Sequence, residues 1–157
     1  ISRNPVCLLN AKKTKVERGF LSEKELKSLE EVPLPANLSI VRDVFIFAVY
    51  TGLSYVDIGN LTNENINVGI DKSLWLSYYR QKTDIHAILP LLQPAVNILK
   101  RYEAYHEGKR NNHIFPVPLN QVMNRYLKKV AKQAGVDKNI TFHLASHSVF
   151  SFFLKNQ

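Results

Sequence analysis

Apolar residues in the first part of the chain recur with helical spacing, between short polar breaks. Ser22 and Glu25 have the spacing of a capping box, so we expect a helix to begin there and to end within residues 32–35, which include two prolines. Residues 36–50 are almost wholly apolar and predict a helix buried in the core. Gly52 follows this stretch and is a typical helix C-terminus.

In the middle of the chain the pattern changes from helices to strands. Ser54, with Asp57 three residues later, can cap a short helix. Residues 74–79 and 86–91 are rich in aromatic and aliphatic side chains and suit strands, and the polar residues 80–85 between them suit a hairpin connection. The pattern therefore predicts a small antiparallel hairpin or sheet.

Helical spacing returns in the second half, over residues 94–106, 120–134 and 143–154. Helices, then a small antiparallel sheet or hairpin, then more helices predict an α+β fold that is mainly α. Residues 1–19 are polar and lack a clear period, so they are expected to form an arm or linker. The remaining residues, 20–157, are then expected to form one domain.

The charge adds a class of partner to this picture. The chain carries 21 basic and 13 acidic side chains, a net charge of +8, which favours a polyanionic partner such as nucleic acid. Most of the excess lies in residues 97–157. Four cations share one face of the predicted helix 120–134: Arg125, Lys128, Lys129 and Lys132. They can bind phosphates, or they form an ordinary solvated helix face.

The composition excludes several other classes of protein. A single cysteine, Cys7, excludes an internal disulfide and a cysteine-cluster metal site. No apolar run approaches the roughly 20 residues that cross a membrane, and the N-terminus has no signal-peptide core. We therefore expect a cytoplasmic protein without membrane association. Because the chain begins with isoleucine, we also expect it to be a fragment or a trimmed product.

Three stretches, in this order, resemble the catalytic domain of tyrosine recombinases, the phage integrase family. The stretches are residues 51–58 (Thr-Gly-Leu-Ser-Tyr-Val-Asp-Ile), residues 80–83 (Arg-Gln-Lys-Thr) followed by 89–91 (Leu-Pro-Leu), and residues 141–147 (Thr-Phe-His-Leu-Ala-Ser-His). A small residue plus tyrosine after Thr-Gly-Leu is most similar to integrases of mobile elements in Bacteroidetes-type bacteria. The resemblance covers roughly residues 20–150.

The resemblance implies DNA integration and recombination without a metal or other cofactor. In this family a tyrosine attacks the scissile phosphate, which leaves a 3′-phosphotyrosine and a free 5′ hydroxyl, and the step is later reversed on a partner strand. Arginines stabilise the charge on the pentavalent phosphate, and a general acid protonates the departing oxygen. The implied partners are double-stranded DNA and other integrase protomers.

Two residues match the family's catalytic positions. Lys82 lies on the hairpin connection, from which its long side chain can enter the minor groove and deliver a proton to the leaving oxygen. His143 matches the histidine of a His-x-x-Arg pair and can act as a general base or a phosphate donor. A zinc site with His147 would lack a third ligand, so His147 is interpreted as packing or surface polarity. The assignment requires Lys82 and His143 to converge on one phosphodiester.

Two other positions depart from the family. Ser54 and Ser146 stand where arginines belong, and a serine hydroxyl has neither the charge nor the donor fork of a guanidinium. Two arginines are candidate surrogates for the first position. Arg80 lies on the same strand face as Lys82. Arg42 lies in the apolar helix and serves either as a surrogate or as a structural partner of an acid such as Asp57.

The chain stops at Gln157, before the positions at which the family's later histidine or tryptophan and its tyrosine would stand. A truncated catalytic domain that binds DNA weakly and does not cut it is therefore expected, with residues 1–19 as the linker from a missing core-binding domain. The alternatives are a full enzyme that continues beyond this sequence and a degenerate, non-catalytic protein-interaction module. Exposed aromatic side chains near the end would favour that module: Phe150, Phe152 and Phe153.

Overall fold

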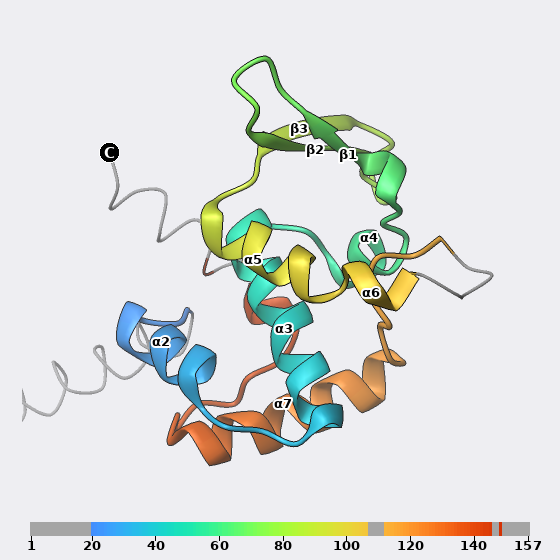
Figure 1. Ribbon diagram of the computed structural model, residues 1–157. Helices are drawn as coiled ribbons and strands as arrows, with labels where there is room; N and C mark the ends of the chain where they lie inside the picture. Colours follow the sequence, from blue (N-terminus) through green and yellow to red (C-terminus); the bar gives the residue numbers. More distant parts are fainter. Residues whose placement is uncertain (1–19, 107–111, 146–147, 149–157) are drawn as a thin grey trace, which may run out of the picture.

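The computed structural model describes residues 20–106, 112–145 and 148. Helix α3 (Ala36–Thr51) lies at the centre of a helical body (Figure 1). Three helices surround it: α2 (Glu23–Glu31), α5 (Gln93–Arg101) and α7 (Asn120–Ala134). The mainly helical α+β fold expected from the sequence is confirmed.

The local signals in the sequence explain where the first helices begin and end. The hydroxyl of Ser22 accepts a hydrogen bond from the amide of Glu25 at 3.2 Å, which caps α2. Gly52 ends α3 in the left-handed region, at a φ of 76°, which a residue with a Cβ rarely adopts. In α3, Phe45 and Phe47 are 1% and 0% exposed, and burying such a side chain is worth about 2 kcal/mol.

A three-stranded antiparallel sheet lies to one side of the helical body (Figure 1). Its strands, in spatial and sequence order, are β1 (Ile66–Val68), β2 (Leu74–Tyr79) and β3 (His86–Pro90). Leu76 of β2 pairs with Ile66 on one side and Leu89 on the other. Leu76 and Tyr78 are buried, whereas Tyr79 is exposed, so the sheet has one covered and one open face.

The structure adds to the predicted elements and divides one of them. Strand β1 and the 3₁₀ turn η1 (Asn63–Asn65) before it are additions. The short helix predicted after Ser54 is present as α4 (Tyr55–Gly59), and it joins α3 to the sheet. The helix predicted over residues 94–106 is two helices, α5 and α6 (Glu103–His106). Between them, the amide of Tyr102 donates to the carbonyl of Leu99 at 3.0 Å, a tight bond that ends α5. Of the helix predicted over 143–154, residues 143–145 and 148 are helical and the others lie outside the described residues.

Candidate functional site

Ser54, at the position that the resemblance gives to an arginine, is the N-cap of α4. Its hydroxyl accepts a hydrogen bond from the amide of Asp57 at 3.2 Å and lies 2.9 Å from the Asp57 carboxylate, to which it donates. This arrangement confirms the predicted cap. The serine side chain is therefore directed into its own helix by two local hydrogen bonds.

The same Asp57 connects α4 to the β2–β3 turn. Its other carboxylate oxygen accepts a hydrogen bond from the backbone amide of Gln81 at 3.1 Å. Asn60, at the C-terminal end of α4, donates from its side-chain amide to the side-chain oxygen of Gln81 at 2.9 Å. Gln81 thus attaches the turn to α4 through both its backbone amide and its side chain.

The turn carries two cations, Arg80 and Lys82, and both are exposed. It is closed by hydrogen bonds from the amide of Arg80 to the carbonyl of Ile85 at 3.0 Å and from the amide of Asp84 to the carbonyl of Arg80 at 2.7 Å. Burial raises the pKa of Tyr78, whereas the positive charge of the nearby Arg80 guanidinium opposes this shift. Arg80 therefore lies beside Tyr78, next to the turn residue that binds α4.

His143 directly follows Phe142, the residue near the C-terminal end of the sequence that packs against α4. It is exposed and begins the helical turn 143–145. The preceding residue, Phe142, is fixed by a hydrogen bond from its amide to the side-chain oxygen of Asn124 in α7, at 2.8 Å. The ring of Phe142 meets that of Tyr55, the first residue of α4, edge to face with centroids 5.8 Å apart.

Helix α4 is therefore the element that the three motif stretches share. Its N-cap belongs to the first stretch, the turn of the second stretch binds it through Gln81, and Phe142 of the third stretch packs on Tyr55. Lys82 and His143 are both exposed rather than packed among apolar side chains. Their convergence on one phosphate stays a prediction.

Arg42, the other candidate surrogate, lies in a different part of the molecule. It precedes the end of α3 by nine residues, about 13 Å along the helix axis. Its side chain is 13% exposed, and its acidic partner is Asp43 rather than Asp57. These contacts favour the structural alternative. Its guanidinium donates to the carbonyls of Glu30 and Val32, to the hydroxyl of Ser39 and to the carboxylate of Asp43.

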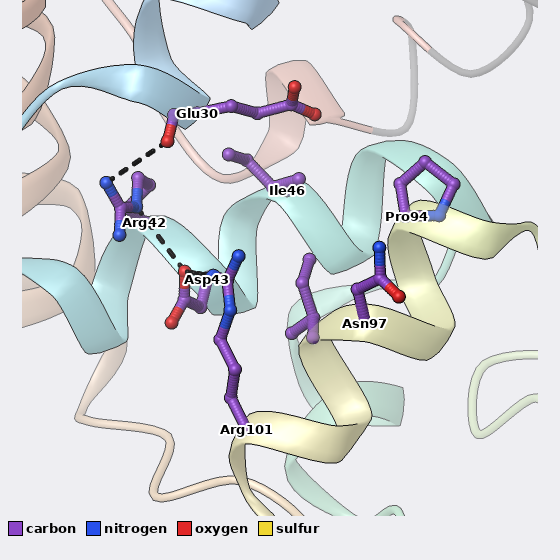
Figure 2. Close-up of a pocket in the computed structure, with 8 residues that line it drawn as sticks. Glu30, Arg42, Asp43, Ile46, Pro94, Asn97 and Arg101 are labelled. Carbon is purple, nitrogen blue, oxygen red and sulfur yellow. Dashed lines mark hydrogen bonds and ion pairs between the residues drawn. The ribbon is translucent and has the colours of Figure 1, made fainter.

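Arg42 and Asp43 form a charged cluster with Arg101 of α5, and these residues line a pocket of about 240 Å³ between α2, α3 and α5. Figure 2 shows how the three side chains lie. Asp43 is 4% exposed and lies between Arg42 and Arg101, which reaches it from α5 with an N–O distance of 3.1 Å. The hydroxyl of Tyr102 donates to the other carboxylate oxygen at 2.8 Å. The cluster ties α3 to α5 and does not include any residue of α4 or the turn.

A family model described as the phage integrase family matches residues 19–157. The match covers most of the chain. The chain belongs to the phage integrase family. No curated protein sequence matches it.

Solved structures with the same fold include two recombinases and an integrase. XerA recombinase has 23% sequence identity over 87% of this chain, with a TM-score of 0.69. XerH recombinase, bound to difH substrate before cleavage, has 16% identity over 88%, also with a TM-score of 0.69. A lambda integrase dimer bound to a COC′ core site has 20% identity over 85%, with a TM-score of 0.57. This chain covers 51%, 43% and 50% of those chains, so it spans about half their length.

Helix α7 of this integrase-family domain carries a basic surface. Arg125, Lys128, Lys129 and Lys132 are all exposed, and we call this set the α7 stripe. The guanidinium of Arg125 and the ammonium of Lys129 lie 5.5 and 5.4 Å from the centroid of the Tyr126 ring. The opposite side of α7 packs against α2 and α3 through four buried residues: Met123, Leu127, Val130 and Ala131.

Other residues named from the sequence lie outside the described part of the chain. They are Ser146, His147, Phe150, Phe152 and Phe153. In the described residues no group of three potential metal ligands comes together, and no helix is long and apolar enough to cross a membrane.

Sequence reasoning missed the connection between Asn60 and Gln81. The sequence marks Asp57 as a capping residue, but Gln81 is one of several polar residues in a turn, and Asn60 is an ordinary residue at the end of a helix. Their contact joins residues 21 positions apart, and no local pattern predicts it.

Proposed function

We propose that this domain is the DNA-binding catalytic core of a site-specific tyrosine recombinase, with the scissile phosphate bound beside α4. One observation carries the proposal: the first motif stretch forms most of this short helix, and the second and third stretches, distant in sequence, both contact it. The solved structures named for complexes with difH and with a COC′ core site support duplex DNA as the partner. Other protomers would join in recombination, as the lambda integrase dimer suggests.

The residues next to α4 would have distinct roles. The ammonium of Lys82, exposed on the turn, would donate a proton to the departing 5′ oxygen. The imidazole of His143 would donate a hydrogen bond to the phosphate or act as a general base. Arg80 would supply the guanidinium that Ser54 cannot, because its side chain lies beside Tyr78 next to the attachment of the turn to α4.

We further propose that this segment binds DNA and does not cleave it. Ser54 and Ser146 both replace arginines of the family pattern, and each missing phosphate-binding charge commonly costs about 3 kcal/mol of transition-state stabilisation. The α7 stripe would bind the DNA backbone outside the reacting phosphate. The residues after Thr-Gly-Leu favour an integrase of a bacterial mobile element, and the composition favours a cytoplasmic location.

Titration of a labelled DNA duplex at about 50 and about 200 mM salt tests the binding part of this proposal. If four cations each neutralise one phosphate, the affinity is expected to fall about 10²-fold between the two conditions. An affinity that does not change with salt, or no binding at low salt, would overturn the proposal. An acidic polypeptide of equal charge serves as competitor and should displace the duplex only weakly.

A protein-interaction module is the second candidate, and the open face of the sheet favours it. Tyr79 and Ile88, on adjacent strands, are 67% and 61% exposed, and Ile85 in the turn is 61% exposed. Gel filtration over a range of concentrations distinguishes the two functions. Self-association without DNA binding would support the module.

A further inference from the structure

Besides the two backbone hydrogen bonds that close it, the β2–β3 turn is held by its contact with α4. The paired strands end at Tyr79 and His86, and the residues between them, 80–85, are all exposed. Arg80 and Lys82 project from this segment on long, flexible side chains, and holding such side chains in one place on DNA costs conformational entropy. A fixed turn lowers that cost.

The helix beneath the turn is itself well fixed. Ile58 of α4 is 1% exposed in the core, and the hydroxyl of Tyr55 donates to the carbonyl of Pro118. Ser54 caps the helix at its N-terminus. At the C-terminal end, the backbone amide of Asn60 donates to the carbonyl of Val56 at 3.1 Å. Helix α4 is thus a rigid base to which the turn can be attached.

The attachment has a backbone part and a side-chain part. The Asp57 carboxylate accepts the amide of Gln81 at 3.1 Å, which fixes the position of the turn backbone. The Asn60 amide donates to the Gln81 side chain at 2.9 Å, and this second bond opposes rotation about the first. Both side chains are exposed, so packing does not force them together.

We propose that Asn60 and Gln81 are positioning residues: their side-chain hydrogen bond holds the β2–β3 turn so that Arg80 and Lys82 reach the same DNA phosphate group. This inference rests on the proposed DNA-binding function. Neither residue touches the reacting atoms. Their effect is transmitted through the turn, which carries one cation on each side of Gln81.

The test uses Asn60→Ala, Gln81→Ala, the double variant and the exchange Asn60→Gln with Gln81→Asn. Each single variant is expected to lower the affinity for a DNA duplex roughly two- to tenfold. The double variant should lose no more than the weaker-binding single variant, and the exchange should restore most of the affinity. Gln93→Ala is the matched control, because it removes a similar exposed bond, to Asn97 at 2.9 Å in α5, and should change nothing.

Two readouts separate positioning from a general loss of structure. Lys82→Ala should cost less affinity in the Asn60→Ala background than in the unaltered chain, because a loose turn no longer presents Lys82. Additive losses for Asn60→Ala and Gln81→Ala would mean that Gln81 contacts DNA directly and would overturn the inference. An Asn60→Ala variant with full affinity and an unchanged contribution of Lys82 would overturn it as well.

The second readout does not need DNA. Hydrogen exchange of the Gln81 amide in the free chain should accelerate in Asn60→Ala and remain unchanged in Gln93→Ala. If the unaltered chain fails to bind DNA, the proposed function is wrong, and this exchange rate alone decides whether the bond holds the turn. An unchanged rate would show that it does not.

Discussion

Asp43 is a buried carboxylate with three hydrogen-bond donors around it. The nitrogen atoms of Arg42 and Arg101 lie 3.4 and 3.1 Å from one oxygen, and the hydroxyl of Tyr102 lies 2.8 Å from the other. Burial, followed by the charge of Asp43, raises the pKa of Tyr102 far above its ordinary value, so the phenol keeps its proton and remains a donor. A buried acid is tolerated here because each oxygen is paired.

Tyr102→Phe is expected to destabilise the domain by about 2 kcal/mol, because a buried carboxylate oxygen loses its donor. Urea unfolding followed by circular dichroism measures the difference. Tyr79→Phe is the matched control, since Tyr79 is 67% exposed and its variant should unfold at the original midpoint. Equal midpoints for both variants would show that the Tyr102 hydroxyl contributes nothing to the cluster.

The acidic partner of Arg42 shows what a sequence can and cannot predict about a single residue. A charge within an apolar helix signals that a partner exists, and the structural alternative named Asp57 as an example. The actual acid is the adjacent Asp43, which is shared with Arg101 from a helix 58 residues further along the chain. That packing of α5 on α3 is a tertiary contact, so local patterns do not contain it.

At the scale of elements, capping signals were the most informative part of the sequence. The caps at Ser22 and Ser54 are confirmed, because each depends on side chains within three residues of the helix start. Strand β1 was missed, since three residues carry no period and its pairing with β2 is non-local. The site follows the same division: the sequence predicted the motif stretches, while their meeting at α4 depends on the fold.

Ser54 caps α4 at the position where the family pattern has an arginine, so restoring that arginine gives a testable prediction. Ser54→Arg removes a cap, which should lower the free energy of unfolding by about 1 kcal/mol. It also adds a guanidinium beside the Arg80 turn, and a charge-assisted bond to phosphate should raise DNA affinity about tenfold. Duplex titration and urea unfolding measure the two effects.

Ser54→Ala is the control for that substitution, because it removes the same cap without adding a charge. Both variants should lose similar stability, and only Ser54→Arg should bind DNA more tightly. If Ser54→Arg binds no better than Ser54→Ala, the N-terminus of α4 does not face the DNA backbone.

At the scale of the whole molecule, the basic surface and the motif stretches are physically connected. Asn124 of α7 fixes Phe142 next to His143, and the α7 stripe begins at the following residue, Arg125. The same helix buries its apolar side against α2 and α3. Helix α7 therefore fixes the residue before His143, packs its apolar side against the core and carries exposed cations on its other side.

This arrangement predicts that the position of charge, and not only the net charge of +8, determines DNA binding. Replacing Lys128, Lys129 and Lys132 by glutamine should reduce the salt dependence of duplex affinity by about 0.9 for each phosphate that is no longer neutralised. A control with the same net charge replaces three other exposed lysines by glutamine: Lys24, Lys27 and Lys72. Its salt dependence should stay near that of the unaltered chain, since these lysines lie on α2 and on the loop before β2. Equal decreases in both triple variants would mean that the duplex is attracted by overall charge, and the α7 stripe would then be an ordinary solvated helix face.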